Sequence, residues 1–486
     1  MSQPNILLIT TDQQRWDCLG LNSPQTDLRT PICDQLAAGG VNFTRAYSTC
    51  PVCIPARRSL LTGLHPHTHG LRGYRDGLEW DPPFTLPGLL SRAGWHTALV
   101  GKLHLHPQRK RYGHELMIRT ESPNDRWDTP LQPVNDWADW LKTQGVAQPN
   151  NIGINGNGRV ARPWDLEERY HHTSWLADQA VDFLTKYRDP SGPYYLHLSF
   201  WAPHPPLIPP QAYWDRYHRR HEHRPTIAEW TPGFDHIPRG IPDDSPRGPF
   251  DEAEMHDAVA GYFGLINHVD DRIRYVLTRL FEYGSPRAKE PTLIVFTSDH
   301  GEMLGDHHLW RKSLPYEGSA HVPMFIAWRN IDGLAPGSCD ELVTLEDITA
   351  TVLEACGQPI PQALAPEHDS TSLMPTLRGQ RQTVRRRVFG ECRGVGSHHY
   401  VVEGRDKYIW FTATDEEQLF DLHEDPRETR DLSADTGRLE PFRKHLAAHL
   451  TDRDDCDYDP SKLTPCGNKP PHALWPAAAS PLASPR

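Results

Sequence analysis

The sequence lacks any long apolar run. Its 486 residues contain no stretch of about twenty consecutive apolar residues, the length that a helix needs to cross a bilayer. Residues 1–4 also lack the basic segment, apolar segment and small-residue cleavage site of an export signal, and they lead directly into an apolar stretch. These absences predict a cytoplasmic protein that does not enter the membrane, provided that no leader precedes the sequence.

A disulfide framework and an excess of basic charge are also absent. The chain has nine cysteines, an odd and scattered number, which indicates reduced thiols in a protein without an export signal. Cys50 and Cys53 have redox or zinc spacing, but no second cysteine pair lies nearby to complete a zinc site. The net charge of −12 argues against nucleic-acid binding and leaves room for a local basic funnel toward an anionic substrate. Homo-oligomerisation is left open.

Two β-prone runs end in acidic residues. Residues 5–11 end at Asp12 and Gln13, and residues 292–298 end at Asp299 and His300. Continuous apolar runs of this length are typical of strands buried on both faces of an α/β sheet. If both strands run the same way in one sheet, their carboxylates meet at its carboxyl edge, where such sheets bind ligands. The pattern therefore predicts a metal site at that edge.

The length of the chain favours one large domain and a smaller one. Apolar periodicity predicts helices over 30–39, 174–186 and 258–281, the last with Asp270 and Asp271 on its polar side, and strands over 96–102 and 194–201. Residues 105–170 and 202–250 are too long for turns and are expected to be active-site loops. Short antiparallel strands and a helix are expected after residue 380. The predicted units are a catalytic α/β domain over 1–380, an α+β subdomain over 381–455 and a Pro- and Ala-rich tail over 456–486.

The stretch from Cys53 to Gly63 predicts a short helix that begins close to Cys53. Pro55 suits the first turn of a helix, and Gly63 suits the position after its end. The free N–H groups of such a helix, with the guanidinium of Arg57, would form a seat for a sulfate or phosphate. Taken alone, a cysteine such as Cys53 is far more often a small buried thiol, and only the rest of the chain reverses that interpretation.

Several motifs follow one another in the order of a known family. The chain resembles sulfatases of the alkaline phosphatase superfamily over most of its length. The resemblance implies a large, mixed, mostly parallel sheet sandwiched by helices, with a smaller C-terminal subdomain of antiparallel sheet and helix. The motifs are Asp12-Gln13, the stretch from Cys53 to Gly63, Gly101-Lys102-Leu103-His104, Ala202 to Pro206, Ser298-Asp299-His300-Gly301, Lys312, Tyr316-Glu317-Gly318 and Gln418 to Leu422.

The resemblance implies a metal centre and a modified cysteine. Cys53 would be oxidised to formylglycine by a maturation enzyme. One divalent cation would be bound, and the oxygen-rich ligand set favours Ca²⁺ first, with Mn²⁺ or Mg²⁺ as alternatives to it. The implied ligands are Asp12, Gln13, Cys53, Asp299 and His300.

The resemblance also implies catalytic roles. A hydroxyl of the hydrated aldehyde at position 53 would attack the sulfur of a small anionic sulfate ester. His204 or Lys312 would protonate the departing alcohol, and His104 is the expected base for the elimination of sulfate. Lys102 and Arg57 would balance the negative charge.

The motifs depart from the commonest pattern at a few positions. Ala56 replaces a frequent serine, and Gln13 stands where many members have a second aspartate. Gly73 and Tyr74 occupy the region where many relatives have an asparagine. The Asp-Gln pair is similar to choline-sulfatase-like and phosphonate-monoester-hydrolase-like members, so a phosphonate monoester or phosphodiester hydrolase is the first alternative to a sulfatase. A non-catalytic binding protein on the same fold is the second.

Overall fold

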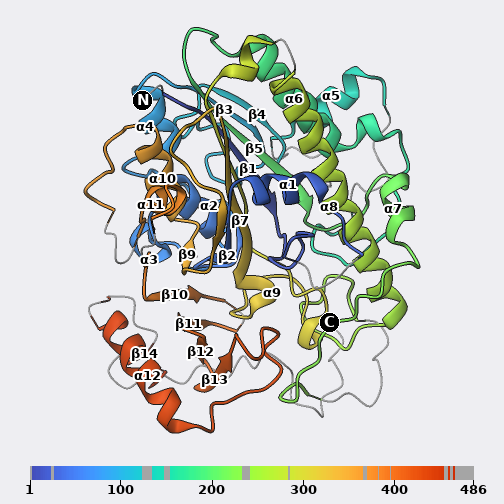
Figure 1. Ribbon diagram of the computed structural model, residues 1–486. Helices are drawn as coiled ribbons and strands as arrows, with labels where there is room; N and C mark the ends of the chain where they lie inside the picture. The colour runs from blue at the N-terminus through green and yellow to red at the C-terminus, as the bar shows by residue number, and fades with distance from the viewer. Residues whose placement is uncertain are drawn as a thin grey trace.

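The computed structural model describes residues 3–22, 27–122, 134–146, 154–232, 241–282, 285–364, 369–380, 383–394, 396–451, 453, 458–459 and 464–465. Within these residues one large sheet runs through the molecule between two layers of helices, and a small separate sheet lies beside it (Figure 1). No described helix is long and apolar enough to span a bilayer.

The large sheet is mixed and mostly parallel at its centre. The strand order is β4-β3-β5-β1-β6-β7-β2-β8, and β9 also pairs with β2. Strands β3, β5, β1 and β6 run parallel to one another, whereas β7 is antiparallel to both β6 and β2. The bounds are β1 Asn5–Asp12, β2 Val41–Tyr47, β3 His96–Gly101, β4 Leu116–Arg119, β5 Tyr194–Pro203, β6 Thr292–Ser298, β7 His321–Arg329, β8 Gly337–Cys339 and β9 Val343–Thr344.

The predicted pairing of the first strand with residues 292–298 is confirmed. Strand β1 lies next to β6 in parallel, with Thr11 opposite Ser298. Its side chains alternate between two cores, because Leu7 and Ile9 pack on one face of the sheet and Ile6 and Leu8 on the other. Burial on both faces explains why the run is continuously apolar.

The two helical layers divide the helices between the faces of the sheet (Figure 1). One layer contains α1 Pro31–Gly39, α5 Asp136–Thr143, α6 His172–Asp182, α7 Gln211–Tyr217 and α8 Glu252–Leu280. The other contains α2 Cys53–Thr62, α4 Leu86–Arg92, α10 Asp347–Ala355 and α11 Met374–Leu377. Two short helices, α3 Pro66–His69 and α9 Glu317–Ala320, lie in the connections.

Asp270 corrects one expectation about α8. The helical pattern placed Asp270 on the polar side, but the residue is only 2% exposed. Its carboxylate accepts the backbone N–H groups of Ile32, at 3.2 Å, and Cys33, at 2.8 Å, and so caps the first turn of α1. Burial raises its pKa to about 6. A neighbouring helix end thus explains a carboxylate inside the core.

The chain after residue 380 forms the expected antiparallel sheet with a helix. Strands β10 Arg387–Cys392, β11 His398–Glu403, β12 Asp406–Phe411 and β13 Glu416–Asp421 form a meander covered by α12 Thr436–Leu450. Buried Lys407 of β12 links this sheet to α9, which directly precedes β7, because its Nζ lies 2.8 Å from Glu317 and also 3.0 Å from Glu428. The domain boundaries stay a prediction, and the tail over 456–486 lies outside the described residues except for β14 Tyr458–Asp459 and β15 Thr464–Pro465.

Candidate active site

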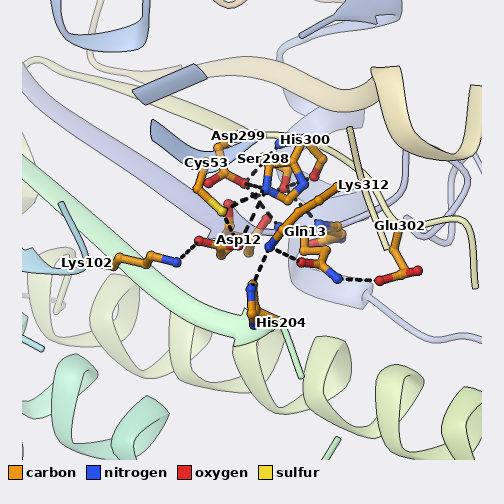
Figure 2. A network of polar contacts seen from close by, with 12 residues as sticks. Asp12, Gln13, Cys53, Lys102, His204, Ser298, Asp299, His300, Glu302 and Lys312 are labelled. Carbon is orange, nitrogen blue, oxygen red and sulfur yellow. Dashed lines mark hydrogen bonds and ion pairs between the residues drawn. The ribbon is translucent and has the colours of Figure 1, made fainter. Parts of the chain in front are cut away.

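Four neighbouring parallel strands each deliver a polar residue to the same edge of the sheet. Asp12 is the last residue of β1, and Lys102, His204 and Asp299 directly follow β3, β5 and β6. Figure 2 shows these side chains converging on one point. Residues from distant parts of the sequence therefore meet because parallel strands end together, as expected for an open α/β sheet.

Cys53 is the first residue of α2 and lies over this edge. The helix begins at Cys53 and ends before Gly63, whose φ of 75° is left-handed, as the sequence predicts. Cys53 is 1% exposed. Its Sγ lies 3.2 Å from His300 Nε2 and 3.9 Å from Asp12 Oδ1. The motif thus places the residue 53 side chain against the ends of β1 and β6.

The side chains at this point form a ligand cluster suited to a cation. One ligand atom each from Asp12, Cys53, Asp299 and His300 lies within 4.8 Å of the others, and all four residues are buried. The two carboxylates and the imidazole of this cluster fit a divalent cation that prefers oxygen ligands. Gln13 lies beside the cluster, but its Oε1 accepts a hydrogen bond from Lys312 Nζ at 2.7 Å.

Arg57 holds the two carboxylates together. Its Nε donates to Asp299 at 2.9 Å and its Nη2 to Asp12 at 2.9 Å. Its Nη1 donates to the Lys102 carbonyl and to Ser199 Oγ, each at 3.0 Å. The guanidinium therefore faces the carboxylates from behind the cavity, where it neutralises their charge rather than forming the wall that a sulfate would contact.

Lys102 reaches the same carboxylate from the cavity side. Its Nζ lies 2.7 Å from Asp12 Oδ2 and 4.1 Å from the centre of the Trp201 ring. Burial alone would raise the pKa of Asp12, but the charges around it, that of Lys102 foremost, hold that pKa well below its usual range. Asp12 is therefore ionised at neutral pH and available to a cation.

Lys312 and His204 form a directly bonded pair. Lys312 Nζ lies 2.7 Å from His204 Nε2, and His204 Nδ1 lies 2.9 Å from the carbonyl oxygen of Pro205. A carbonyl can only accept, so Nδ1 carries the proton and Nε2 receives the hydrogen bond from the ammonium. Burial and then the charge of Lys312 hold the pKa of His204 well below its usual value. His204 is therefore the neutral member of the pair.

His104 enters the site from a strained backbone position. Its φ is 57°, in the left-handed region, and its backbone N–H donates to Glu121 Oε2 at 2.8 Å. Its buried Nδ1 has no hydrogen-bond partner among the residues that the structure describes. Burial, followed by the charges of Lys102 and Arg57, holds the pKa of His104 well below its usual value. The imidazole is thus neutral at neutral pH and able to accept a proton.

These groups surround a cavity of about 690 Å³. Cys53 is at its floor, and Lys102, His104, His204 and Lys312 also line it. The two predicted active-site loops contribute to the wall, as does the segment after β10. The lining residues from these segments include His106, Gln108, Glu121, Asn157, Pro246, Arg247, Arg393 and Gly394.

Some residues of the site escaped the sequence reasoning. Glu302 contacts Gln13, Trp201 lies against Lys102, and Glu121 fixes the His104 backbone. Glu302 and Trp201 lie within a few residues of the motifs, so their positions were a usable signal. Glu121 is far enough from His104 in sequence that no local pattern connects them.

Comparison with known proteins agrees with this geometry. The family model described as Sulfatase matches residues 4–358, and the model described as N-sulphoglucosamine sulphohydrolase, C-terminal, matches residues 305–455. The chain is 36% identical to an arylsulfatase of Clostridium perfringens, over 95% of this chain and 97% of that protein. It is 30% identical to a choline-sulfatase of Rhizobium meliloti, over 92% of this chain and 87% of that protein.

Among solved structures, the phosphonate monoester hydrolase of Agrobacterium radiobacter has the same fold. The TM-score is 0.74 at 24% identity, with 92% of this chain and 96% of that chain covered. The match of one family model to most of the chain, together with relatives that align over nearly its full length, shows that the chain belongs to the sulfatase family and is a sulfuric ester hydrolase.

Proposed function

We propose that the chain hydrolyses sulfate monoesters of aryl, small organic or sugar alcohols, with formylglycine at position 53 and one divalent cation, Ca²⁺ first. The supporting observation is the buried cluster of Asp12, Cys53, Asp299 and His300, whose ligand atoms lie within 4.8 Å of one another beside a cavity with cationic walls. Formylglycine requires a maturation enzyme as a partner of the newly made chain.

When bound, the cation would polarise the sulfate and, with the hydrated aldehyde, supply an acidic hydroxyl as the nucleophile. The protein's own residues prepare this centre. Arg57 holds Asp12 and Asp299 side by side and offsets their charge. Lys102 at the cavity wall contributes a positive charge beside the seat of the sulfate.

Proton transfer is assigned to two separate groups. The departing alcohol needs a proton, and the ammonium of Lys312, bonded to His204 at the cavity wall, supplies it. His204, whose Nε2 accepts a hydrogen bond from Nζ, orients the ammonium for this transfer. His104 is neutral, and its Nδ1 has no partner within the described part of the chain, so it accepts the proton whose loss expels sulfate from residue 53.

Turnover of two substrate classes tests this proposal. Protein produced together with a formylglycine-generating enzyme should hydrolyse 4-nitrophenyl sulfate with a higher kcat/KM than phenyl phosphonate monoesters or phosphodiesters. A preference for the phosphorus esters would identify the alternative activity. Gln13 motivates that comparison, because an amide in place of a carboxylate lowers the negative charge beside the cation.

Mass measurement of the peptide that contains Cys53 distinguishes the hypothesis of an enzyme from that of a binding protein. Conversion of the thiol to an aldehyde is the expected result in co-produced protein. An unmodified thiol under these conditions, together with no hydrolysis of either ester class, would support a non-catalytic protein on the sulfatase fold.

A further inference from the structure

A buried carboxylate without a catalytic assignment lies behind Gln13. Glu302 is fully buried, and Figure 2 shows it at the end of a row formed with Gln13, Lys312 and His204. Its Oε2 accepts a hydrogen bond from Gln13 Nε2. Its Oε1 accepts the backbone N–H of Leu304 at 2.9 Å and that of Arg311. Both oxygens therefore act as acceptors.

The carboxylate of Glu302 decides which way the Gln13 amide points. An amide has an acceptor end and a donor end of nearly the same shape, so packing alone does not distinguish two orientations. Only the NH₂ end can face a carboxylate, and only the oxygen end can face an ammonium. With Glu302 on one side and Lys312 on the other, the oxygen is directed to Lys312, at 2.7 Å.

The backbone of Gln13 is anchored as well, which fixes the point from which its side chain extends. Its N–H donates to Asp299 Oδ1 at 3.1 Å, and its carbonyl accepts from the Tyr262 hydroxyl at 2.7 Å. Its φ of 71° is left-handed. The side chain extends from this anchored backbone, and its amide is held between Glu302 and Lys312 by its own hydrogen bonds.

Glu302 thus holds Lys312 from two directions. It binds the N–H of Arg311, the residue directly before Lys312, and it orients the amide that binds Lys312 Nζ. The same Nζ is 2.7 Å from His204 Nε2. Loss of the first contact would release the backbone, and reversal of the amide would set an NH₂ group against the ammonium.

We infer that Glu302 is a positioning residue, which sets the polarity of the Gln13 amide and thereby holds the Lys312 ammonium against His204 for protonation of the departing alcohol. This inference rests on the proposed function, in which the Lys312–His204 pair is the acid. A group that donates this proton matters most when the alcohol is a poor leaving group.

The test compares leaving groups in the isosteric variant Glu302→Gln. The new side-chain oxygen at position 302 would keep the two backbone N–H groups, so the new NH₂ would face Gln13 and reverse that amide. For the mature enzyme with Ca²⁺, we expect kcat/KM to fall by about 10²-fold for phenyl sulfate and by less than about tenfold for 4-nitrophenyl sulfate. The dependence of kcat/KM on the leaving group becomes steeper.

A double variant restores the acceptor that faces Lys312 and has the same net charge as the wild type. In Gln13→Glu/Glu302→Gln, the amide at position 302 donates to the carboxylate at position 13, whose other oxygen accepts from Lys312. We expect the leaving-group dependence to return toward that of the wild type. Asp270→Asn is the matched control, because it also converts a buried carboxylate to an amide but lies outside the site, and it should leave that dependence unchanged.

Equal losses for both esters would overturn the inference, because they would indicate a general effect on the fold or on cation binding. So would a double variant no better than Glu302→Gln. If Glu302→Gln does not fold, Gln13→Met breaks the same link from its other end and must show the same steeper dependence. A wild-type enzyme that hydrolyses neither ester would instead overturn the proposed function.

Discussion

The guanidinium Nε of Arg57 lies 2.9 Å from Asp299 Oδ2, and both side chains are almost completely buried. The same guanidinium binds Asp12 through Nη2. Two carboxylates that would otherwise repel each other in a low-dielectric interior are therefore held together before any cation arrives. The arrangement makes Arg57 part of the structure of the site, and it leads to a prediction about stability.

Replacement of Arg57 by alanine is expected to destabilise the cation-free protein by about 3–5 kcal/mol, because two buried carboxylates lose their counter-charge. The deficit should shrink when Ca²⁺ is added, since the cation supplies positive charge to the same carboxylates. Urea unfolding with and without Ca²⁺ measures both effects. Arg109→Ala, which removes an exposed ion pair with Asp136, is the control and should change stability little. An Arg57→Ala deficit that is the same in both conditions would contradict this account.

Removal of the modifiable side chain should separate activity from folding. Cys53→Ala is expected to abolish ester hydrolysis, whereas the free energy of unfolding changes by about 1 kcal/mol, because only one sulfur atom is lost. Cys53→Ser should also fail to turn over, since a serine sulfate has no second hydroxyl from which sulfate could be expelled. Steady-state assays and thermal unfolding of both variants check this. Multiple turnovers by Cys53→Ser would argue against a formylglycine mechanism.

The free energy of unfolding at acid pH is expected to depend on Glu391 in β10. Its carboxylate oxygens lie 2.7 Å and 2.9 Å from Arg453 Nη2. Burial alone would raise the pKa of Glu391, but His399 and Arg453 outweigh it and lower the pKa to about 2. A depressed pKa favours the folded state above the unfolded value of about 4.3, and this contribution is lost as the pH falls from there to about 2.

Unfolding free energies measured across this pH range, in the wild type and in Glu391→Gln, test the assignment. The variant should be less stable than the wild type at neutral pH and should lose less stability on acidification. Parallel curves for the two proteins would show that another carboxylate is responsible.

Removal of the cation should lower stability as well as activity. A ligand that binds only the folded state stabilises it by about 2.7 kcal/mol at a hundredfold excess over Kd. Chelation should therefore lower the melting temperature, and Ca²⁺, Mn²⁺ or Mg²⁺ should restore it. In Asp299→Asn the cation should have a smaller effect, because one of the two carboxylates is gone. A melting temperature that chelation leaves unchanged in the wild type would speak against a cation at this cluster.

Much of the fold was accessible from sequence, because long patterned elements carry strong signals. The strands at 5–11 and 292–298 and the helix at 30–39 agree with the structure within a residue. Strands β2 and β7 were not predicted. Strand β2 mixes polar and apolar residues, as connecting segments do, and β7 is apolar but contains Pro323, a residue that argues against a strand inside a sheet. Asp270 was misplaced because helical periodicity cannot foresee that the end of α1 abuts α8.

The sequence predicted which residues form the site, but it did not predict which of their atoms contact one another. The motifs identified Asp12, Cys53, Asp299 and His300, which the structure brings together. They did not show that Arg57 faces the carboxylates, nor that Gln13 Oε1 faces Lys312. The direction of the Gln13 side chain depends on a left-handed backbone angle at that residue, which leaves no signal in a residue that is not glycine.

The strand order determines when the site can assemble during folding. In the sheet the central strands stand in the order β3, β5, β1, β6, so the residues that meet at their ends come from the beginning, the middle and the later part of the chain. Contacts between such distant segments are slow to form. During synthesis, the cluster of Asp12, Cys53, Asp299 and His300 cannot form until β6 has emerged and inserted beside β1. If the cluster binds a cation as proposed, the appearance of that binding would report that β1 and β6 have paired.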